Sequence, residues 1–380
     1  MKRFFQILIV GITCYFAGCI EPYDPPEIGD FDDLLVIDAN VNGTVGEANV
    51  ILSRGQALDD DSPVEYVSGA VVELEMEDGT VFQLQANGNG KYYINGLGLS
   101  FGDRVRLHII DADGTEYLSD YEEYVKTPEI DSVSYDSNKE GVNFYVSTHD
   151  PNNNTFYYKW DFTETWKFRS AFPSSYIWER IDTSIIVKPR EMIDTLYYCY
   201  KYDSSTQIII GNSKRLSEDR ISEYRIAKID NSTGKFGERY SMLVKQRALT
   251  EESYKYWELL KSNTESIGSL FDPQPSQLNS NIINITNPEI GVLGYFNVYS
   301  ETQQRISLVF SDVEPHFYNN GYGNCVFDTI YVEDLYDDLF GQLLISDLTE
   351  GISPYAYLYS FPSCMDCRLR GTNKVPEFWQ

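Results

Sequence analysis

Hydrophobic and polar positions alternate in short runs from residue 34 onward, with no helical period for roughly the next two hundred residues. A period of two predicts strands with one buried face. Asp78-Gly79 and Asp113-Gly114 supply the turns expected between paired strands. The strands predicted in this first part are residues 34–36, 71–74, 81–84, 92–94 and 105–109. We therefore predict an immunoglobulin-like β-sandwich over residues 34–128.

A second β-rich domain is predicted over residues 129–380. Its alternating runs are residues 142–146, 156–168, 176–187, 207–210 and 224–229. The run at 156–168 exceeds ordinary strand length, which favours a large curved sheet or a barrel-like body.

One helix is predicted near residues 250–262. Thr250 can cap its N-terminus, and two glutamates follow where the helix dipole favours negative charge. Hydrophobic positions then recur at helical spacing, at Tyr254, Trp257 and Leu260. The fold class is thus mainly β, an N-terminal sandwich followed by a larger β-rich domain with one clear helix and a Cys-x-x-Cys tail.

Residues 1–18 have the layout of a secretory signal peptide. Two basic residues precede an apolar run, and small residues follow it. The run is too short to span a bilayer comfortably, so a plain transmembrane anchor is the weaker interpretation. Phe16-Ala17-Gly18-Cys19 resembles a bacterial lipobox, at which cleavage leaves a lipidated Cys19. An ordinary signal peptide cut near Gly18 is the alternative.

Residues 19–33 are rich in proline and acidic residues, which predicts an extended tether. Two or three acyl chains on Cys19 would hold a soluble domain on a membrane durably. Acidic residues directly after the cysteine resemble the surface-export signal of Bacteroidota lipoproteins. We therefore expect an outer-membrane protein, anchored through Cys19 and facing the cell exterior.

The charge balance narrows the possible partners. The chain has 58 acidic and 30 basic residues, for a net charge of −28. Nucleic acids and anionic lipid surfaces require a basic face, so we expect no nucleic-acid partner. Cleavage before Cys19 removes two basic residues and no acidic ones, which leaves 362 residues with a net charge of −30.

Four cysteines remain after lipidation of Cys19, and they are the disulfide candidates: Cys199, Cys325, Cys364 and Cys367. Four cysteines allow three connectivities. A bridge inside Cys364–Cys367 would constrain little of the unfolded chain, which favours bridges from this pair to the two distant cysteines. A four-cysteine zinc site is the alternative, although it usually needs a second close pair.

Other motifs predict no catalytic residue, cofactor or metal site. The sequence has no Gly-x-Ser-x-Gly elbow, His-Glu-x-x-His, phosphate loop or dinucleotide fingerprint. Asp150 to Asp161 copies the spacing of a calcium loop but lacks its central glycine, so an Asx turn is favoured. His149 beside Asp150 is interpreted as a surface histidine. The three histidines, His108, His149 and His316, are isolated in the sequence.

Aromatic residues cluster between residues 157 and 178. Exposed aromatic side chains often bind sugars or proteins. Alternation within strands nevertheless places about half of such a set in the core, by the period of two. We expect most of these seven residues in the core and a minority exposed: Tyr157, Tyr158, Trp160, Trp166, Phe168, Tyr176 and Trp178.

Several phrases resemble known families. Residues 70–103 resemble carboxypeptidase-regulatory-like modules, which are transthyretin-like sandwiches. Nearly the whole mature chain resembles the Bacteroidota lipoproteins of the domain-of-unknown-function 4249 family. The phrases that carry this resemblance are residues 239–246, the Trp257 helix, 271–275, 281–282, 292–296 and, most specific, Cys364 to Gly371 with 374–379.

The family resemblance implies an outer-membrane lipoprotein, commonly encoded beside a TonB-dependent transporter, and no established reaction. We therefore expect a non-enzymatic accessory or binding protein that works with such a transporter in nutrient uptake. A surface hydrolase of polysaccharide or protein is one alternative, and a structural or adhesive surface protein is another.

Overall fold

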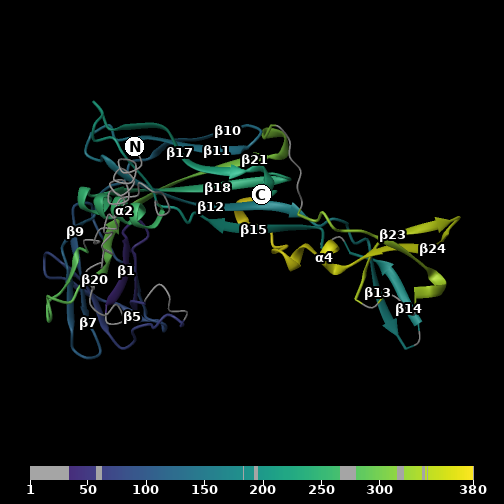
Figure 1. Cartoon of the computed structure of the whole chain (residues 1–380), viewed down its shortest axis with the longest axis horizontal. Coiled ribbons are helices and arrows are strands. Elements are labelled where there is room, and N and C mark those ends of the chain that lie inside the picture. Colours follow the sequence, from purple (N-terminus) through teal and green to yellow (C-terminus); the bar gives the residue numbers. More distant parts are fainter. Residues whose placement is uncertain are drawn as a thin grey trace, which may run out of the picture.

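The computed structural model describes residues 34–56, 62–182, 184–191, 196–265, 280–314, 321–335, 339 and 341–379. The predicted signal peptide, Cys19, the tether, the loop at 271–275 and His316 lie outside these residues. Within the described part, no helix is long and apolar enough to cross a membrane. The fold is mainly β, as predicted. Its five sheets form three units along the long axis of the molecule (Figure 1).

The N-terminal unit is a sandwich of two sheets. The first has the order β20-β1-β2-β6-β5, with bounds β1 (Leu35–Asn42), β2 (Glu47–Arg54), β5 (Gln85–Ala86), β6 (Lys91–Asn95) and β20 (Val292–Tyr299). The second has the order β19-β8-β7-β3-β4, with β9 also on β7. Its bounds are β3 (Val71–Met76), β4 (Val81–Gln83), β7 (Arg104–Ile110), β8 (Glu116–Ser119), β9 (Glu122–Glu123) and β19 (Ile282–Asn284).

Hydrophobic residues at every second strand position form the core between these sheets. Ile37 and Leu52 of the first sheet and Leu107 of the second are almost fully buried. Burying one such side chain stabilises the fold by roughly 1.5–3 kcal/mol. Asp-Gly turns join β3 to β4 and β7 to β8, as predicted.

Two strands of the sandwich come from residues 282–299, although the sequence predicts a second domain over residues 129–380. β20 runs parallel to β1 over its full length, from Leu35 opposite Val292 to Asn42 opposite Tyr299. Parallel strands cannot be joined by a tight turn, so no turn sequence next to either strand predicts this pairing. Gly294 faces Ile37 with a φ of 126°, and a Cβ there would lie 1.9 Å from the Ile37 carbonyl oxygen.

The middle unit is a second sandwich. One sheet has the order β10-β11-β17, with bounds β10 (Ile130–Ser137), β11 (Gly141–His149) and β17 (Arg220–Asp230). The other has the order β15-β12-β18-β21, with β16 also on β12. Its bounds are β12 (Tyr157–Arg169), β15 (Tyr198–Ser204), β16 (Ile209–Asn212), β18 (Arg239–Leu249) and β21 (Glu301–Val309).

The large curved sheet or barrel-like body expected for this region is thus replaced, among the described strands, by separate sheets. β12 is long because two short strands share one of its edges: β16 pairs with its first part and β15 with its second. Of the clustered aromatics, Tyr158 and Trp160 are fully buried between the sheets and the other five are half-buried. None of the seven is exposed.

The chain passes between the two sandwiches twice, and the two connecting segments lie side by side. Thr127, which precedes β10, donates from its backbone N–H to the Ser300 Oγ at 2.6 Å and from its Oγ1 to the Ser300 carbonyl at 2.7 Å. Ser300 links β20 to β21, and its Oγ also donates to the Val125 carbonyl at 2.9 Å. Thr127 and Ser300 are both buried. The junction is therefore held by two parallel segments rather than by a single linker.

Helix α2 (Glu251–Glu265) covers this junction and contacts β12, β16, β18 and β20. The Thr250 Oγ1 accepts the backbone N–H of Ser253 at 3.2 Å, which confirms the predicted cap. Three short 3-10 helices occur among the described residues before the C-terminal tail: η2 (Asn231–Thr233), η3 (Phe310–Asp312) and η4 (Val332–Asp334).

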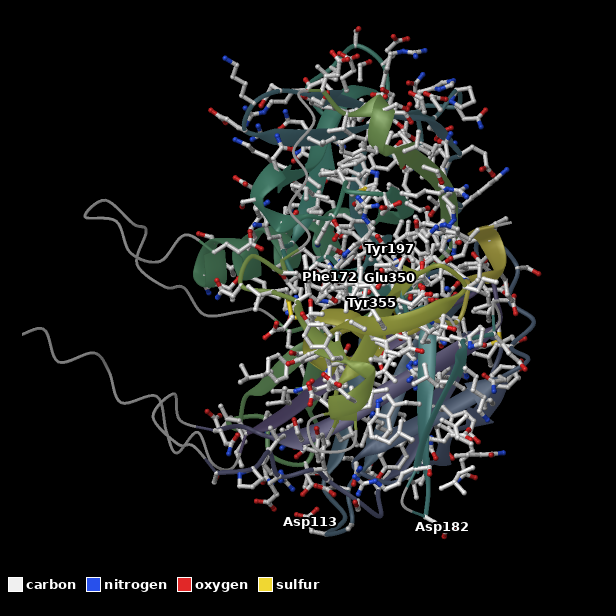
Figure 2. All side chains as sticks on the ribbon, turned by 90° about the vertical axis from the view of Figure 1, so that its right-hand side faces the viewer. Asp113, Phe172, Asp182, Tyr197, Glu350 and Tyr355 are labelled. Atoms are coloured by element: carbon white, nitrogen blue, oxygen red, sulfur yellow. A yellow bond between two sulfur atoms is a disulfide. The ribbon has the colours of Figure 1, made fainter. Side chains whose placement is uncertain are left out.

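The third unit is a five-stranded sheet that projects away from the two sandwiches. Its order is β14-β13-β23-β24-β22, with bounds β13 (Tyr176–Ile181), β14 (Ser184–Pro189), β22 (Asp328–Tyr331), β23 (Leu343–Glu350) and β24 (Ser353–Ser360). Leu344, Tyr357 and Trp178 belong to its own small core. The β13–β14 hairpin carries Asp182 at the periphery of the molecule, as the view along the long axis shows (Figure 2).

Two disulfides fasten the C-terminal tail. Cys199 of β15 pairs with Cys367, and Cys325 pairs with Cys364, which confirms the long-range connectivity. The tail contains α4 (Pro362–Met365), η5 (Cys367–Leu369) and η6 (Glu377–Trp379). Backbone hydrogen bonds between Tyr200 and Thr372 add the tail to the edge of the middle sandwich.

The remaining sequence motifs have local structural roles. The carboxylate of Asp150 accepts the backbone N–H groups of Asn152, Asn154 and Thr155, which is the predicted Asx turn. The His149 Nδ1 lies 2.8 Å from the Asp131 carboxylate in an exposed contact, so His149 is a surface histidine, as interpreted from the sequence, and it contacts Asp131.

The two disulfides are expected to stabilise the fold unequally, because they span 168 and 39 residues of sequence. Loop-closure entropy predicts losses of about 5 kcal/mol for Cys199→Ser/Cys367→Ser and about 4 kcal/mol for Cys325→Ser/Cys364→Ser. Guanidinium unfolding of both double variants measures the difference. A larger loss in the second variant would contradict the chain-entropy account.

Candidate functional site

A cavity of about 780 Å³ lies between helix α2 and the N-terminal sandwich. Its walls come from the start of β7, the segment 120–123, α2, the residues just before β19, and β20. Four carboxylates and three tyrosines are among its lining residues: Asp120, Glu122, Glu123, Glu252, Tyr121, Tyr256 and Tyr295. The chain returns to the N-terminal sandwich through β19 and β20, which follow α2 in the sequence. This return brings the helix next to the sandwich and so forms the cavity.

Glu122 is the most perturbed carboxyl group of this cavity. Only 8% of the residue is exposed, and its Oε1 accepts hydrogen bonds from the Asn281 amide at 2.8 Å and the Tyr295 hydroxyl at 2.9 Å. Burial raises the pKa of Glu122 to about 7 despite these bonds, and the nearby charges of Glu252 and Asp120 act in the same direction. Glu122 is thus poised to change its charge near neutral pH.

Asn281 and Tyr295 hold Glu122 in place. The Asn281 side chain accepts the backbone N–H of Phe296 and donates to the carbonyl of the same residue, both at 2.9 Å. Burial raises the pKa of Tyr295, and the neighbouring Glu122 adds to this shift. Tyr295 therefore stays protonated and donates. Its ring lies 4.7 Å from that of Tyr256 on helix α2.

The two basic residues of the lining are paired with carboxylates outside it. Lys255 binds Glu251 at 2.8 Å, and Arg104 binds Glu77 at 2.6 Å. Lys255 also feels the charge of Glu252, but the four carboxylates of the lining outnumber its two cations. Such a cavity favours a cationic ligand, because the carboxylates attract positive charge and tyrosine rings contact cations face-on.

The cavity offers no nucleophile activated by a histidine, since neither histidine nor cysteine occurs among the described residues that line it. The only chemistry that its side chains suggest is that of paired carboxylates.

A second group of charges lies at the junction of the sandwiches. Arg247 binds Glu301 through two nitrogens at 3.1 and 3.0 Å and lies 3.3 Å from Asp161. Lys159 binds Asp161 at 2.8 Å and lies over the Trp257 ring at 4.7 Å. Burial lowers the pKa of Lys159, while Asp161 opposes the shift. These charges are paired with one another, so removing any one of them would leave an uncompensated charge at the junction.

The residues predicted from the sequence lie apart from the cavity. The four cysteines lie in or near the C-terminal tail, and Cys19 lies outside the described residues. Sequence reasoning missed Glu122 and Tyr295. Asn281 and Tyr295 lie in two of the segments that carry the family resemblance, residues 281–282 and 292–296. No sequence pattern marks Glu122, because its burial depends on strands that are distant in the sequence.

The pKa of Glu122 predicts a pH dependence of stability. The native state keeps the proton to about pH 7, whereas the unfolded chain loses it near the ordinary value of 4.5. The free energy of unfolding should therefore fall as pH rises through this window, by at most about 3 kcal/mol. Thermal melts of Glu122→Gln should lack this component. Glu123→Gln removes an exposed neighbouring carboxylate and should keep the pH dependence of wild type. If stability changes equally with pH in wild type and in both variants, Glu122 is not the group responsible.

Comparison with known protein families identifies one match. Residues 20–305 match the family described as "Domain of unknown function (DUF4249)". The match includes the whole N-terminal sandwich and helix α2, and it ends before the tail that contains Cys364 and Cys367. No curated protein matches this sequence.

A solved structure described as "Biofilm associated protein - BSP domain" aligns over 74% of this chain and 59% of its own, at 7% identity and a TM-score of 0.14. A likeness of that degree carries no information about fold or function. The family match, in contrast, spans most of the 380 residues, so the chain belongs to the DUF4249 family.

Proposed function

We propose that this protein is a lipid-anchored outer-membrane accessory protein that binds a ligand and works with a TonB-dependent transporter in nutrient uptake. The lipobox ending at Cys19 and the acidic tether support the anchor and the display on the cell surface. The neighbours implied by the family resemblance support the transporter as partner.

The observation that carries the binding role is the acidic, tyrosine-lined cavity beside helix α2. Its key groups are fixed by hydrogen bonds and by packing between strands, as in a preformed binding site. Tyr256 can contact a cationic group while Glu252 and Asp120 supply the negative field. The ligand class that fits is therefore a small organic cation.

The anchor and the partner can be tested together. Cys19→Ser should move the protein out of the membrane fraction, whereas Cys14→Ser should not, because Cys14 lies in the segment removed with the signal peptide. The wild-type protein should co-purify with a transporter from detergent-solubilised membranes. If it purifies alone, and its deletion leaves transporter-dependent growth unchanged, the proposal fails.

A surface hydrolase is the second candidate, and one observation favours it. A carboxyl group with a pKa of about 7 can act as a general acid, as Glu122 would in this cavity. Glycoside hydrolysis needs a second carboxylate at a defined separation, a role open to Glu252. The third candidate, an adhesive protein, needs no cavity.

Assays on panels of polysaccharides and peptides separate these functions. We expect no turnover from wild type or from Glu122→Gln. A hydrolase would instead lose roughly 100-fold or more of its activity in Glu122→Gln, because general acid catalysis contributes at least that factor. Glu123→Gln serves as the matched control. Turnover that depends on Glu122 would replace the binding proposal.

A further inference from the structure

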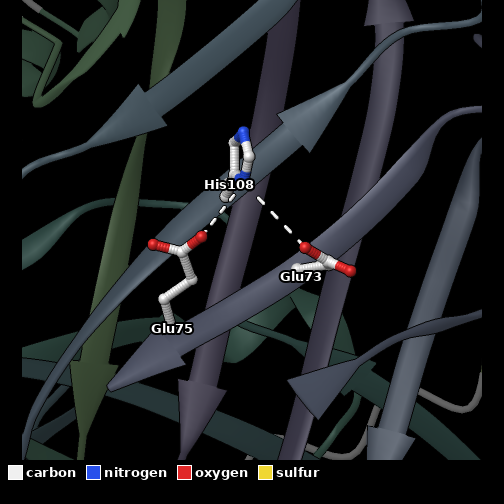
Figure 3. A group of neighbouring side chains, drawn as sticks. All are labelled: Glu73, Glu75 and His108. Atoms are coloured by element: carbon white, nitrogen blue, oxygen red, sulfur yellow. Dashed lines mark hydrogen bonds and ion pairs between the residues drawn. The ribbon is translucent and has the colours of Figure 1, made fainter. Parts of the chain in front are cut away.

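A histidine with three carboxylates lies on the outer face of the N-terminal sandwich, away from the cavity. His108 of β7 pairs directly opposite Glu73 of β3, and Glu75 lies two residues further along the same strand. Val72 and Leu74 point into the core, so the alternating glutamates point outward. The three side chains converge from two adjacent strands (Figure 3).

Their separations suit a shared metal ion. The His108 Nδ1 lies 3.1 Å from the Glu75 Oε1 and 3.9 Å from the Glu73 Oε2. One ligand atom from each of the three residues lies within 4.8 Å of the others. A tetrahedral ion with bonds of about 2.0–2.2 Å separates its ligand atoms by about 3.3 Å, which falls between the two distances from the histidine.

Neighbouring side chains orient these groups as they would around a metal. The His108 Nε2 lies 3.5 Å from the Glu116 Oε2 on β8. In the hydrogen bond between His108 and Glu75, Nδ1–H donates to the Glu75 Oε1 at 3.1 Å. A metal ion would replace this proton, and the Nε2–H would then face Glu116, as in carboxylate–histidine–metal sites. Arg106 holds the other oxygen of Glu75, Oε2, at 2.6 Å. The Oε1 of Glu75 is thereby directed at His108.

The local charge also favours a divalent ion. Glu73, Glu75 and Glu116 contribute three negative charges, and Arg106 contributes one positive charge. With a neutral imidazole, two negative charges remain. His149 provides a contrast, because the carboxylate that it faces belongs to Asp131 alone.

We propose that Glu73, Glu75 and His108 bind a divalent transition-metal ion of the zinc type on the outer face of the sandwich. A nitrogen ligand with two carboxylates suits zinc, whereas calcium and magnesium prefer oxygen ligands. The bound ion would link β3 to β7, and Glu116 would act as a positioning residue through His108. None of these four residues lines the cavity, and the site does not rest on the proposed transport role.

Zinc titration of the full chain, purified in mild detergent and treated with a chelator, tests the site. In competition with a fluorescent chelator, wild type should bind one equivalent of Zn²⁺ saturably. His108→Gln and Glu73→Gln should abolish this binding. Glu116→Gln should weaken it by about 10-fold, because residues that orient a metal ligand typically contribute 10–100-fold to affinity. His149→Gln is the matched control and should bind as wild type does.

Two results of the Zn²⁺ titration would overturn the site. The first is saturable Zn²⁺ binding that His108→Gln leaves unchanged. The second is an absence of saturable binding in wild type. Thermal melting checks the folding of each variant and gives a second readout, since Zn²⁺ should raise the melting temperature of wild type and of His149→Gln but not of His108→Gln. Ca²⁺ should produce no such shift, and an equal shift with Ca²⁺ would mean that surface acidity alone attracts the ion.

Discussion

The parallel pairing of β1 with β20 is the constraint on which the rest of the described structure depends. It joins residues 35–42 to residues 292–299 over eight paired positions. Once β20 is in place, the chain must leave the first sandwich through Ser300 and enter β21 of the second. The same pairing places Tyr295 beside Glu122 and so forms one wall of the cavity. Gly294 allows the close approach of the two backbones.

The junction between the sandwiches gives the cavity rigid walls. Thr127 and Ser300 bind each other through backbone and side chain, and Arg247 pairs with two carboxylates beneath helix α2. Removing one partner from such a buried network leaves an unsatisfied charge or polar group, which costs several kcal/mol, typically about 3–5. The helix therefore rests on a surface that cannot easily shift. The preformed shape of the cavity follows from this support.

The projecting third sheet depends on the tail instead. The Cys325–Cys364 bridge ties the approach to β22 to the segment after β24, and the Cys199–Cys367 bridge ties that segment to the middle sandwich. The third sheet has only a small core, which includes Leu344 and Tyr357. Small cores rarely provide much stability alone, so covalent links to a larger unit compensate. The two bridges thus act where hydrophobic burial is weakest.

The sequence alone determined the class of the fold, most individual strands, the Thr250 cap of α2 and the long-range use of the four cysteines. These features follow from local periodicity, turn chemistry and loop entropy, which a single stretch of chain contains. Only the tertiary structure decided that residues 282–299 belong to the first sandwich, and that Glu122 is buried against Asn281 and Tyr295. It also decided that His108 faces three carboxylates. Register between distant strands sets each of these outcomes, because a shift of one residue would turn every side chain to the opposite face.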